Sequence, residues 1–171
     1  MEHLVRKLLL KSFTGESEVL LTGRTPSRGE LEQKFQHIDA LGLYLHIPFC
    51  EQICPYCPYN KELYRRDVAE RYAHAVKREI DLYAGIVGDR PITSFYIGGG
   101  TPTTMLHSGL AEILEHIRDV LNLQCEIHME SHPNHLSAGN LRRIASLGVQ
   151  HLSMGVEALQ DRHPGVHYRA L

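Results

Sequence analysis

The chain has 171 residues, of which 43% are hydrophobic and 22% charged, and this is enough for one globular domain with its own core. The net charge is −2 with histidine counted as neutral, so the sequence has no basic excess of the kind that nucleic-acid partners require. The longest apolar run near the N-terminus, residues 8–10, is too short for a signal peptide or a membrane span. We therefore expect a cytoplasmic protein without a membrane span.

Residues 1–40 read as an N-terminal extension, with a turn-rich stretch at residues 23–29 and a helix expected from Glu30 to about Ile38. Residues 41–171, in contrast, alternate strand and helix patterns. The expected strands are residues 42–47, 92–97, 126–131 and 149–156, and the expected helices are residues 67–85, 108–121 and 137–147.

The expected helices have recognisable ends and one apolar face each. Asp67 and Glu70 resemble a capping box at the start of the first helix, Gly85 is its expected C-cap, and Ser137 is the expected N-cap of the third. The apolar residues expected to face the sheet are Val68, Tyr72, Val76, Ile80 and Tyr83, then Leu110, Ile113, Leu114, Ile117 and Leu121, and finally Leu141, Ile144 and Leu147.

About four β/α units in succession predict an α/β fold with a parallel sheet and right-handed crossovers. Two architectures fit this order of elements, a β/α barrel and a doubly wound sheet. Both place functional residues at the carboxyl ends of the strands. The unusual residues of this sequence follow strand ends: three cysteines at residues 50–57, glycines at residues 98–100, and the stretch from Glu130 to His132.

Cys50, Cys54 and Cys57 lie within eight residues, a spacing that favours metal binding over a disulfide framework. Three thiolates on a four-iron cluster leave one iron open for another ligand. The alternatives are a Cys3His zinc site completed by His46 or His132, and three thiols without any ligand. The fourth cysteine, residue 125, begins the third strand and is expected to be a small buried core residue.

The stretch from Leu43 to Cys57, with its Tyr-x-His-Ile-Pro-Phe-Cys lead-in, resembles the radical SAM superfamily. Within it, the stretch is most similar to the branch of oxygen-independent coproporphyrinogen III dehydrogenase (HemN) and the haem chaperone HemW. The resemblance covers roughly residues 42–169 and implies a partial β/α barrel. It also implies a [4Fe–4S] cluster on Cys50, Cys54 and Cys57, with S-adenosylmethionine at the fourth iron. Because four units are fewer than this barrel needs, we expect a chain that is truncated before the barrel is complete.

The same resemblance assigns residues to the cofactor. The glycine turn at residues 98–103 matches the motif that holds the methionyl group, Glu130 matches a ribose or methionyl contact, and Arg169 matches a partner of the methionyl carboxylate. From residue type alone, the glycines could serve turn geometry only, Glu130 could be a surface carboxylate, and Tyr44 could be a core aromatic. The implied cofactor-binding residues are Tyr44, Tyr56, Gly99, Gly100, Thr101, Glu130, Glu157 and Arg169.

The implied reaction is reductive cleavage of S-adenosylmethionine to methionine and a 5′-deoxyadenosyl radical, with electrons from a donor such as flavodoxin or ferredoxin. A coproporphyrinogen III oxidase-like oxidoreductase acting on a tetrapyrrole or haem is the expected function. Tyr59 stands where the dehydrogenase has a further cysteine, which moves the expectation toward HemW-like proteins and other tetrapyrrole-directed relatives. The alternatives are a non-enzymatic haem chaperone-like or metal-binding module, and an inactive truncated fragment.

Overall fold

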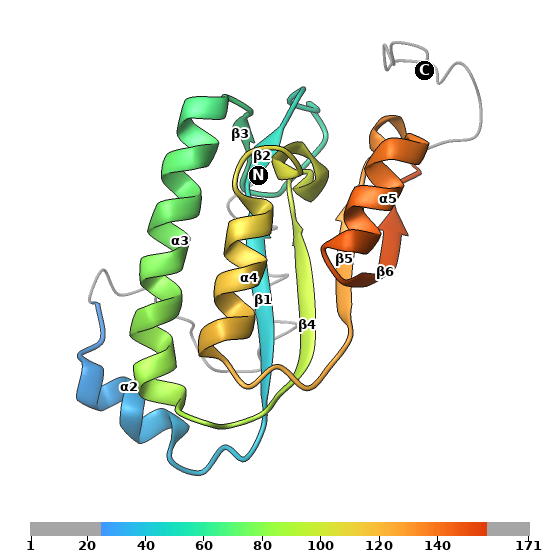
Figure 1. The fold of residues 1–171 in the computed structure, drawn as a ribbon. Coiled ribbons are helices and arrows are strands. Elements are labelled where there is room, and N and C mark those ends of the chain that lie inside the picture. Colours follow the sequence, from blue (N-terminus) through green and yellow to red (C-terminus); the bar gives the residue numbers. More distant parts are fainter. Residues whose placement is uncertain (1–24, 157–171) are drawn as a thin grey trace, which may run out of the picture.

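The computed structural model describes residues 25–156, which form a four-stranded parallel sheet covered by helices (Figure 1). The sheet has the order β1-β4-β5-β6, and a second sheet pairs the short strands β2 and β3. The strands are β1 (Leu41–Ile47), β2 (Phe49–Cys50), β3 (Glu62–Leu63), β4 (Ile92–Gly99), β5 (Ile127–Ser131) and β6 (Val149–Met154). The helices are α2 (Arg28–Phe35), α3 (Arg66–Val87), α4 (Leu110–Val120) and α5 (Ala138–Ser146), with short 3-10 helices η1 (Pro102–Met105) and η2 (Pro133–His135).

The strand order decides between the two architectures that the sequence left open. The four long strands follow one another across the sheet in chain order, without the reversal that marks a doubly wound sheet. Helices α3, α4 and α5 lie on the same face of that sheet (Figure 1). The described residues therefore form part of a β/α barrel, as expected.

The core lies between this face of the sheet and the helices. Alternate residues of the strands point into it, including Leu45 and Ile47 of β1 and Phe95 and Ile97 of β4. The apolar stripe of α4 meets them and is completely buried. This packing holds the carboxyl ends of β1 and β4 side by side, with Ile47 opposite Gly99.

The opposite face of the sheet carries a row of rings. Tyr44, Tyr96, His128 and His151 occupy matching positions on the four neighbouring strands. The rings of Tyr44 and Tyr96 are stacked at 6.3 Å, and those of His128 and His151 at 4.2 Å. No helix of residues 25–156 covers this face, and polar rings on such a face are what the interior of an incomplete barrel presents. His128 and Glu130 share this face, because they alternate with the buried residue Met129 along β5.

Two predictions for the ends of α3 are wrong. The helix begins one residue earlier, with Arg65 as an N-cap that makes no side-chain capping bond, and Asp67 instead pairs with Arg65 and Arg71. The helix also continues through Gly85 to Val87, and Gly88, with φ of 59°, is the actual C-cap. At Gly85 the missing side chain leaves room for Arg28 of α2, whose Nη2 donates to the Gly85 carbonyl at 3.0 Å.

Two residues expected to face the sheet are exposed. Tyr83 is 42% exposed because the 3.6-residue period of α3 carries the inward stripe from Ile80 to Ala84, which packs against the core in its place. Leu141 is 43% exposed on α5, which covers β6 at the edge of the sheet.

Several predicted boundaries also differ from the structure. Strand β4 continues two residues further to Gly99, so the glycine turn begins inside the sheet. Helix α4 begins at Leu110, because η1 intervenes, and β6 ends at Met154.

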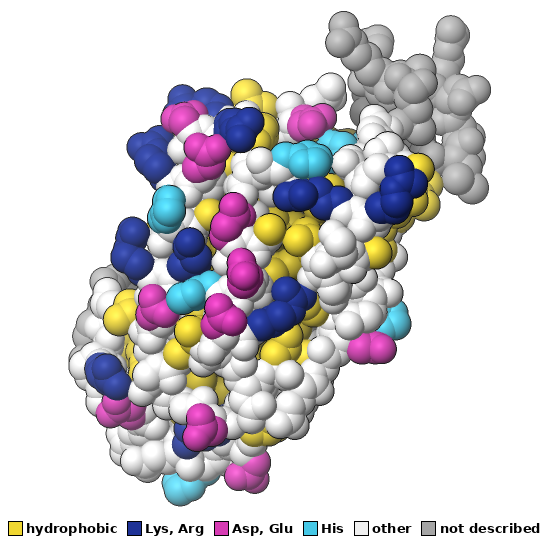
Figure 2. Space-filling model, viewed as in Figure 1, with side chains coloured by type: hydrophobic (Ala, Val, Ile, Leu, Met, Phe, Trp, Pro, Cys, Tyr) yellow, Lys and Arg dark blue, Asp and Glu magenta, His cyan; other side chains and the backbone are white. Residues whose placement is uncertain are grey.

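The described part of the N-terminal extension packs on the rest of the chain through α2 and α3. Ser27 caps α2 in a capping box with Glu30, which explains why the helix begins two residues before the predicted start. Within residues 25–156, no helix is both long and apolar enough to cross a membrane. Acidic and basic side chains are interspersed on the helical side of the molecule (Figure 2).

Candidate functional site

The three cysteines lie in and after β2, at the carboxyl end of the sheet. Backbone bonds from Glu62 N to the Pro48 carbonyl and from Tyr64 N to the Cys50 carbonyl, both 2.8 Å, bring the two ends of the intervening loop together. We call residues 51–61 the cysteine loop. The buried ring of Phe49 anchors its base by edge-to-face contacts with Tyr64 and Tyr72.

The glycine turn packs directly on the strand that carries the first cysteine. Gly100 N donates to the Ile47 carbonyl and Thr101 N to the Phe49 carbonyl, each at 2.8 Å. A Cβ atom at Gly100 would lie 2.8 Å from the Cys50 sulfur, so the approach requires glycine. The Thr101 hydroxyl lies 3.7 Å from the same sulfur. The close packing of this turn on Cys50 is thus one geometric reason for glycine at this position.

Glu130 joins this turn from the third strand of the sheet. One carboxylate oxygen accepts a hydrogen bond from Gly99 N at 3.1 Å, and the other accepts from the Tyr96 hydroxyl at 3.0 Å. Glu130 is consequently a half-buried, oriented carboxylate rather than a surface residue near a turn. It faces the side of the sheet that the helices leave open.

Tyr44 lies on the same face and is 56% exposed, so it is not a core aromatic. Its hydroxyl lies 3.3 Å from Nδ1 of His46. Burial and the nearby Glu130 carboxylate raise the pKa of Tyr44, and burial with the Glu130 hydrogen bond raises the pKa of Tyr96. Both phenols therefore stay protonated as hydrogen-bond donors at neutral pH.

Cys50 lies on β2, and Cys54 and Cys57 lie in the cysteine loop. In the part of the chain that the structure describes, no three side chains of His, Cys, Asp or Glu are arranged to hold a metal ion. Burial raises the pKa of Cys50, although the Thr101 hydrogen bond opposes this shift. Cys57 N donates to the Cys54 carbonyl at 3.2 Å, and the Lys61 ammonium donates to the Cys57 carbonyl.

The donor set nevertheless fits an iron–sulfur cluster in chemistry and place. Thiolates are the usual ligands of such clusters, and the loop opens beside a glycine turn that exposes backbone groups. The buried Nε2 atom of His46 has no hydrogen-bond partner within residues 25–156, which leaves a polar atom to be satisfied beside this turn. A preformed metal geometry is not required, because ligand binding and local folding are coupled.

Each of the two candidate fourth zinc ligands uses its Nδ1 atom in a contact with a neighbouring group. His46 contacts Tyr44, and the side chain of His132 accepts from Asn134 N at the start of η2. Tyr56 is 46% exposed in the cysteine loop. Cys125 is only partly buried, although it packs against the core as expected.

Glu157 and Arg169 lie outside the described residues, so their assignments stay predictions. Sequence reasoning missed Tyr96, which holds Glu130 and stacks on Tyr44. Its position on β4, two residues before Gly98, could have indicated a side chain on the same face as the glycine turn.

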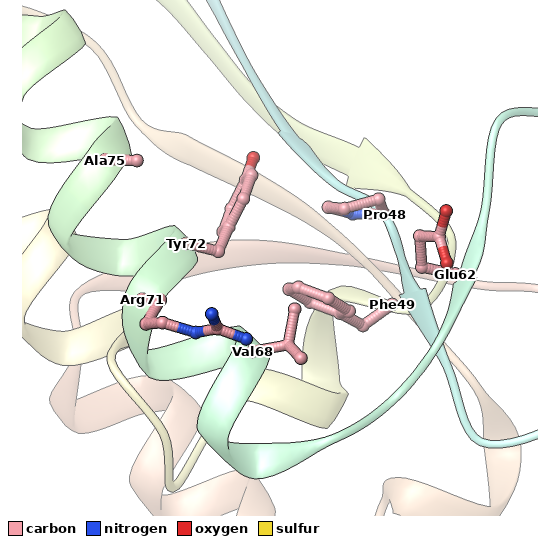
Figure 3. Close-up of a pocket in the computed structure, with 7 residues that line it drawn as sticks. All are labelled: Pro48, Phe49, Glu62, Val68, Arg71, Tyr72 and Ala75. Carbon is pink, nitrogen blue, oxygen red and sulfur yellow. The ribbon is translucent and has the colours of Figure 1, made fainter.

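A pocket of about 420 Å³ lies between α3 and the strand pair β2–β3 (Figure 3). Tyr72 stands at its wall, and its hydroxyl donates to the His46 carbonyl at the end of β1. This bond ties α3 to the strand that leads into the cysteines. The lining residues are Pro48, Phe49, Glu62, Val68, Arg71, Tyr72 and Ala75.

Replacing Tyr72 by phenylalanine tests the hydrogen bond to the His46 carbonyl. We expect a loss of about 1 kcal/mol in the free energy of unfolding at pH 8, because the His46 carbonyl loses its donor. Burial raises the pKa of Tyr72 to about 12 from its ordinary 10.0, so the native chain loses this contribution as pH rises from 10 to 12. In urea unfolding, the difference in the free energy of unfolding between the native chain and Tyr72→Phe should become smaller above pH 10. A difference that does not change with pH would contradict the hydrogen bond from Tyr72 to the His46 carbonyl.

The profile of the Radical SAM superfamily matches residues 44–171. The chain belongs to the radical SAM superfamily. As a member, it is 34% identical over 121 residues to the "Heme chaperone HemW" of Bacillus subtilis, covering 69% of this chain and 32% of that protein. It is 33% identical over 120 residues to the "Oxygen-independent coproporphyrinogen III oxidase" of Salmonella typhimurium, covering 68% of this chain and 26% of the relative.

The structure of the coproporphyrinogen III oxidase HemN from Escherichia coli, described as a radical SAM enzyme, superposes with a TM-score of 0.77 and 27% identity. The superposition covers 91% of this chain and 37% of HemN. The radical SAM fold expected from the sequence is thereby confirmed. The chain covers between 26% and 37% of the length of these relatives.

Proposed function

We propose that Cys50, Cys54 and Cys57 bind a [4Fe–4S] cluster, and that the chain binds S-adenosylmethionine beside it for reductive cleavage. The observation that carries the proposal is the packing of the glycine turn on Cys50, with Glu130 bonded to the same turn. Three strand ends thus bring a thiol, exposed backbone groups and an oriented carboxylate to one edge of the sheet. When bound, the cluster supplies the electron that cleaves the sulfonium.

The residues of the chain divide the binding task in this proposal. The backbone of Gly99, Gly100 and Thr101 receives the methionyl group, and Glu130 accepts hydrogen bonds from its amine or from the ribose. Tyr44 lies on the open face of the sheet, and Tyr56, which is 46% exposed in the cysteine loop, would contact the cofactor by resemblance. Glu157 and Arg169 complete the site by resemblance, with Arg169 suited to a carboxylate through its two-pronged geometry.

The proposed ligand class is a tetrapyrrole or haem, since the relatives are named a coproporphyrinogen III oxidase and a haem chaperone. The preferred function is a coproporphyrinogen III oxidase-like oxidoreductase. The second candidate is a haem chaperone-like module, favoured by Tyr59 at the position of the oxidase's additional cysteine. In either case, residues 41–171 are the radical SAM core and residues 1–40 are an extension. For the oxidoreductase, a cytoplasmic flavodoxin or ferredoxin supplies the electron.

Anaerobic reconstitution with iron and sulfide tests the proposal. We expect about four irons per chain, a spectrum that changes when S-adenosylmethionine is added, and 5′-deoxyadenosine after addition of dithionite. One zinc per chain without such a change would show a zinc module instead. A cluster that responds to S-adenosylmethionine but yields no 5′-deoxyadenosine would favour the binding protein or an inactive fragment.

The role of Glu130 can be separated from its role in the fold. Glu130→Gln keeps the acceptor for Gly99 or Tyr96 but removes the negative charge, so we expect about tenfold weaker binding of S-adenosylmethionine to the reconstituted chain. The iron content should not change. Isothermal titration calorimetry measures the affinity, with the exposed Glu115→Gln on α4 as control. Equal affinities in the two variants would contradict the assignment.

A further inference from the structure

We propose that His135 is a positioning residue for the cysteine loop, holding it against the glycine-turn side of the site so that a bound cluster is retained. The inference rests on the proposed function, since it concerns the same loop, but it concerns residues that no cofactor motif includes. It starts from one chain of side-chain contacts, Thr103–His135–Glu51, which joins three separate loops at the carboxyl edge of the sheet.

The geometry of this chain is specific. Nδ1 of His135 lies 2.7 Å from the Thr103 hydroxyl on η1, and Nε2 lies 3.3 Å from the Glu51 carboxylate in the cysteine loop. One neutral tautomer satisfies both contacts, with Nε2–H donating to Glu51 and Nδ1 accepting from Thr103. The imidazole therefore bridges the segment after β4 to the residue directly following Cys50.

His135 is itself held from two sides. Its side chain is 14% exposed, and Thr103 beneath it is 5% exposed, so one end of the chain is fixed in the body of the domain. Asn140 Nδ2 donates to the His135 carbonyl at 2.8 Å, which fixes the backbone of η2. The Glu51 end is different, because that side chain is 67% exposed on the loop. The buried end of this chain of contacts is therefore the fixed point to which the exposed loop end is attached.

The contact is placed where it affects the cluster ligands. Lys61 closes the far end of the cysteine loop through the carbonyls of Cys57 and Tyr59. The contact between Glu51 and His135 holds the N-terminal end of the cysteine loop, one residue after Cys50. Cys54 lies in the sequence between these two contacts. Loss of the His135 contact frees the N-terminal end of the loop, which raises the rate at which the cluster is lost.

The test compares reconstituted full-length chains for iron release to a chelator under anaerobic conditions. We expect Glu51→Ala and His135→Leu each to release iron about fivefold faster than the native chain, the size of one hydrogen bond at a partly exposed site. Glu51→Gln should restore the native rate, because its amide oxygen still accepts from Nε2. The double variant should be no faster than either single one.

His107→Ala is the matched control: His107 also contacts Asn140, at 3.4 Å, and within residues 25–156 its side chain makes no hydrogen bond to the cysteine loop. The proposal would be overturned if Glu51→Ala released iron at the native rate. It would also be overturned if Glu51→Gln released iron as fast as Glu51→Ala. Because Glu51 is exposed, its variants fold even where His135→Leu does not. A native chain that takes up no four-iron cluster would overturn the proposed function as well, whereas native release with normal cleavage would overturn only the role of His135.

Discussion

Cys54→Ser is expected to abolish cluster assembly and to lower 5′-deoxyadenosine formation more than about 100-fold, beyond the 10- to 100-fold typical of losing a residue that only supports a ligand. Serine differs by one atom but offers an alcohol in place of a thiolate, and iron–sulfur clusters depend on thiolate ligands. Cys54 is the middle ligand of the proposed three, and its carbonyl forms the turn to Cys57. Iron analysis and the visible spectrum after anaerobic reconstitution measure the effect.

Cys125→Ser provides the control for this substitution. Cys125 lies before β5, at the opposite end of the sheet from the cysteine loop, and packs partly against the core. We expect native iron content and native product formation, with only a small loss of stability. Equal iron contents in Cys54→Ser and in the native chain would refute the assignment of Cys54. Loss of iron in the Cys125 variant would instead point to a different set of ligands.

The fold was predictable because its signals are local. Turn residues, helical spacing and apolar runs marked the four long strands and the helices that follow them. The errors concern places where tertiary contacts accompany a departure from local preference: Gly85 looks like a helix end, yet α3 continues past it, and Arg28 of α2 occupies the space beside it. Strand order was the one global choice left open, and it depends on pairing between distant segments.

The residues of the site could be predicted from the sequence, but the contacts between them could not. The cysteines, the glycines and Glu130 each follow a strand end, so their common location follows from parallel topology. What holds them could not be derived in this way. Tyr96 reaches Glu130 across 34 positions of sequence, and His135 reaches Thr103 across 32. Such contacts depend on strand register and side-chain direction, which hydrophobic patterns do not specify.

Gly99→Ala is expected to lower the free energy of unfolding by about 3 kcal/mol and to disrupt the site together with the fold. Two costs act at this position. Gly99 has φ of 122°, which residues with a side chain rarely adopt, and a Cβ atom there would lie 2.6 Å from the Ile47 carbonyl. Relief requires β4 to move away from β1, which would also carry Gly99 N away from the Glu130 carboxylate.

Urea unfolding of the cluster-free chain measures this cost without involving the cofactor. Gly29→Ala is the matched control: no atom lies within 4 Å of its added Cβ, and its place inside α2 predicts a gain of about 0.5 kcal/mol. After reconstitution, weaker binding of S-adenosylmethionine should accompany the lower stability of Gly99→Ala and not the Gly29 variant. If Gly99→Ala unfolds at the native urea concentration, the close approach of β4 to Ile47 is not part of the folded protein. The glycine turn would then not connect Cys50 with Glu130 in the folded protein.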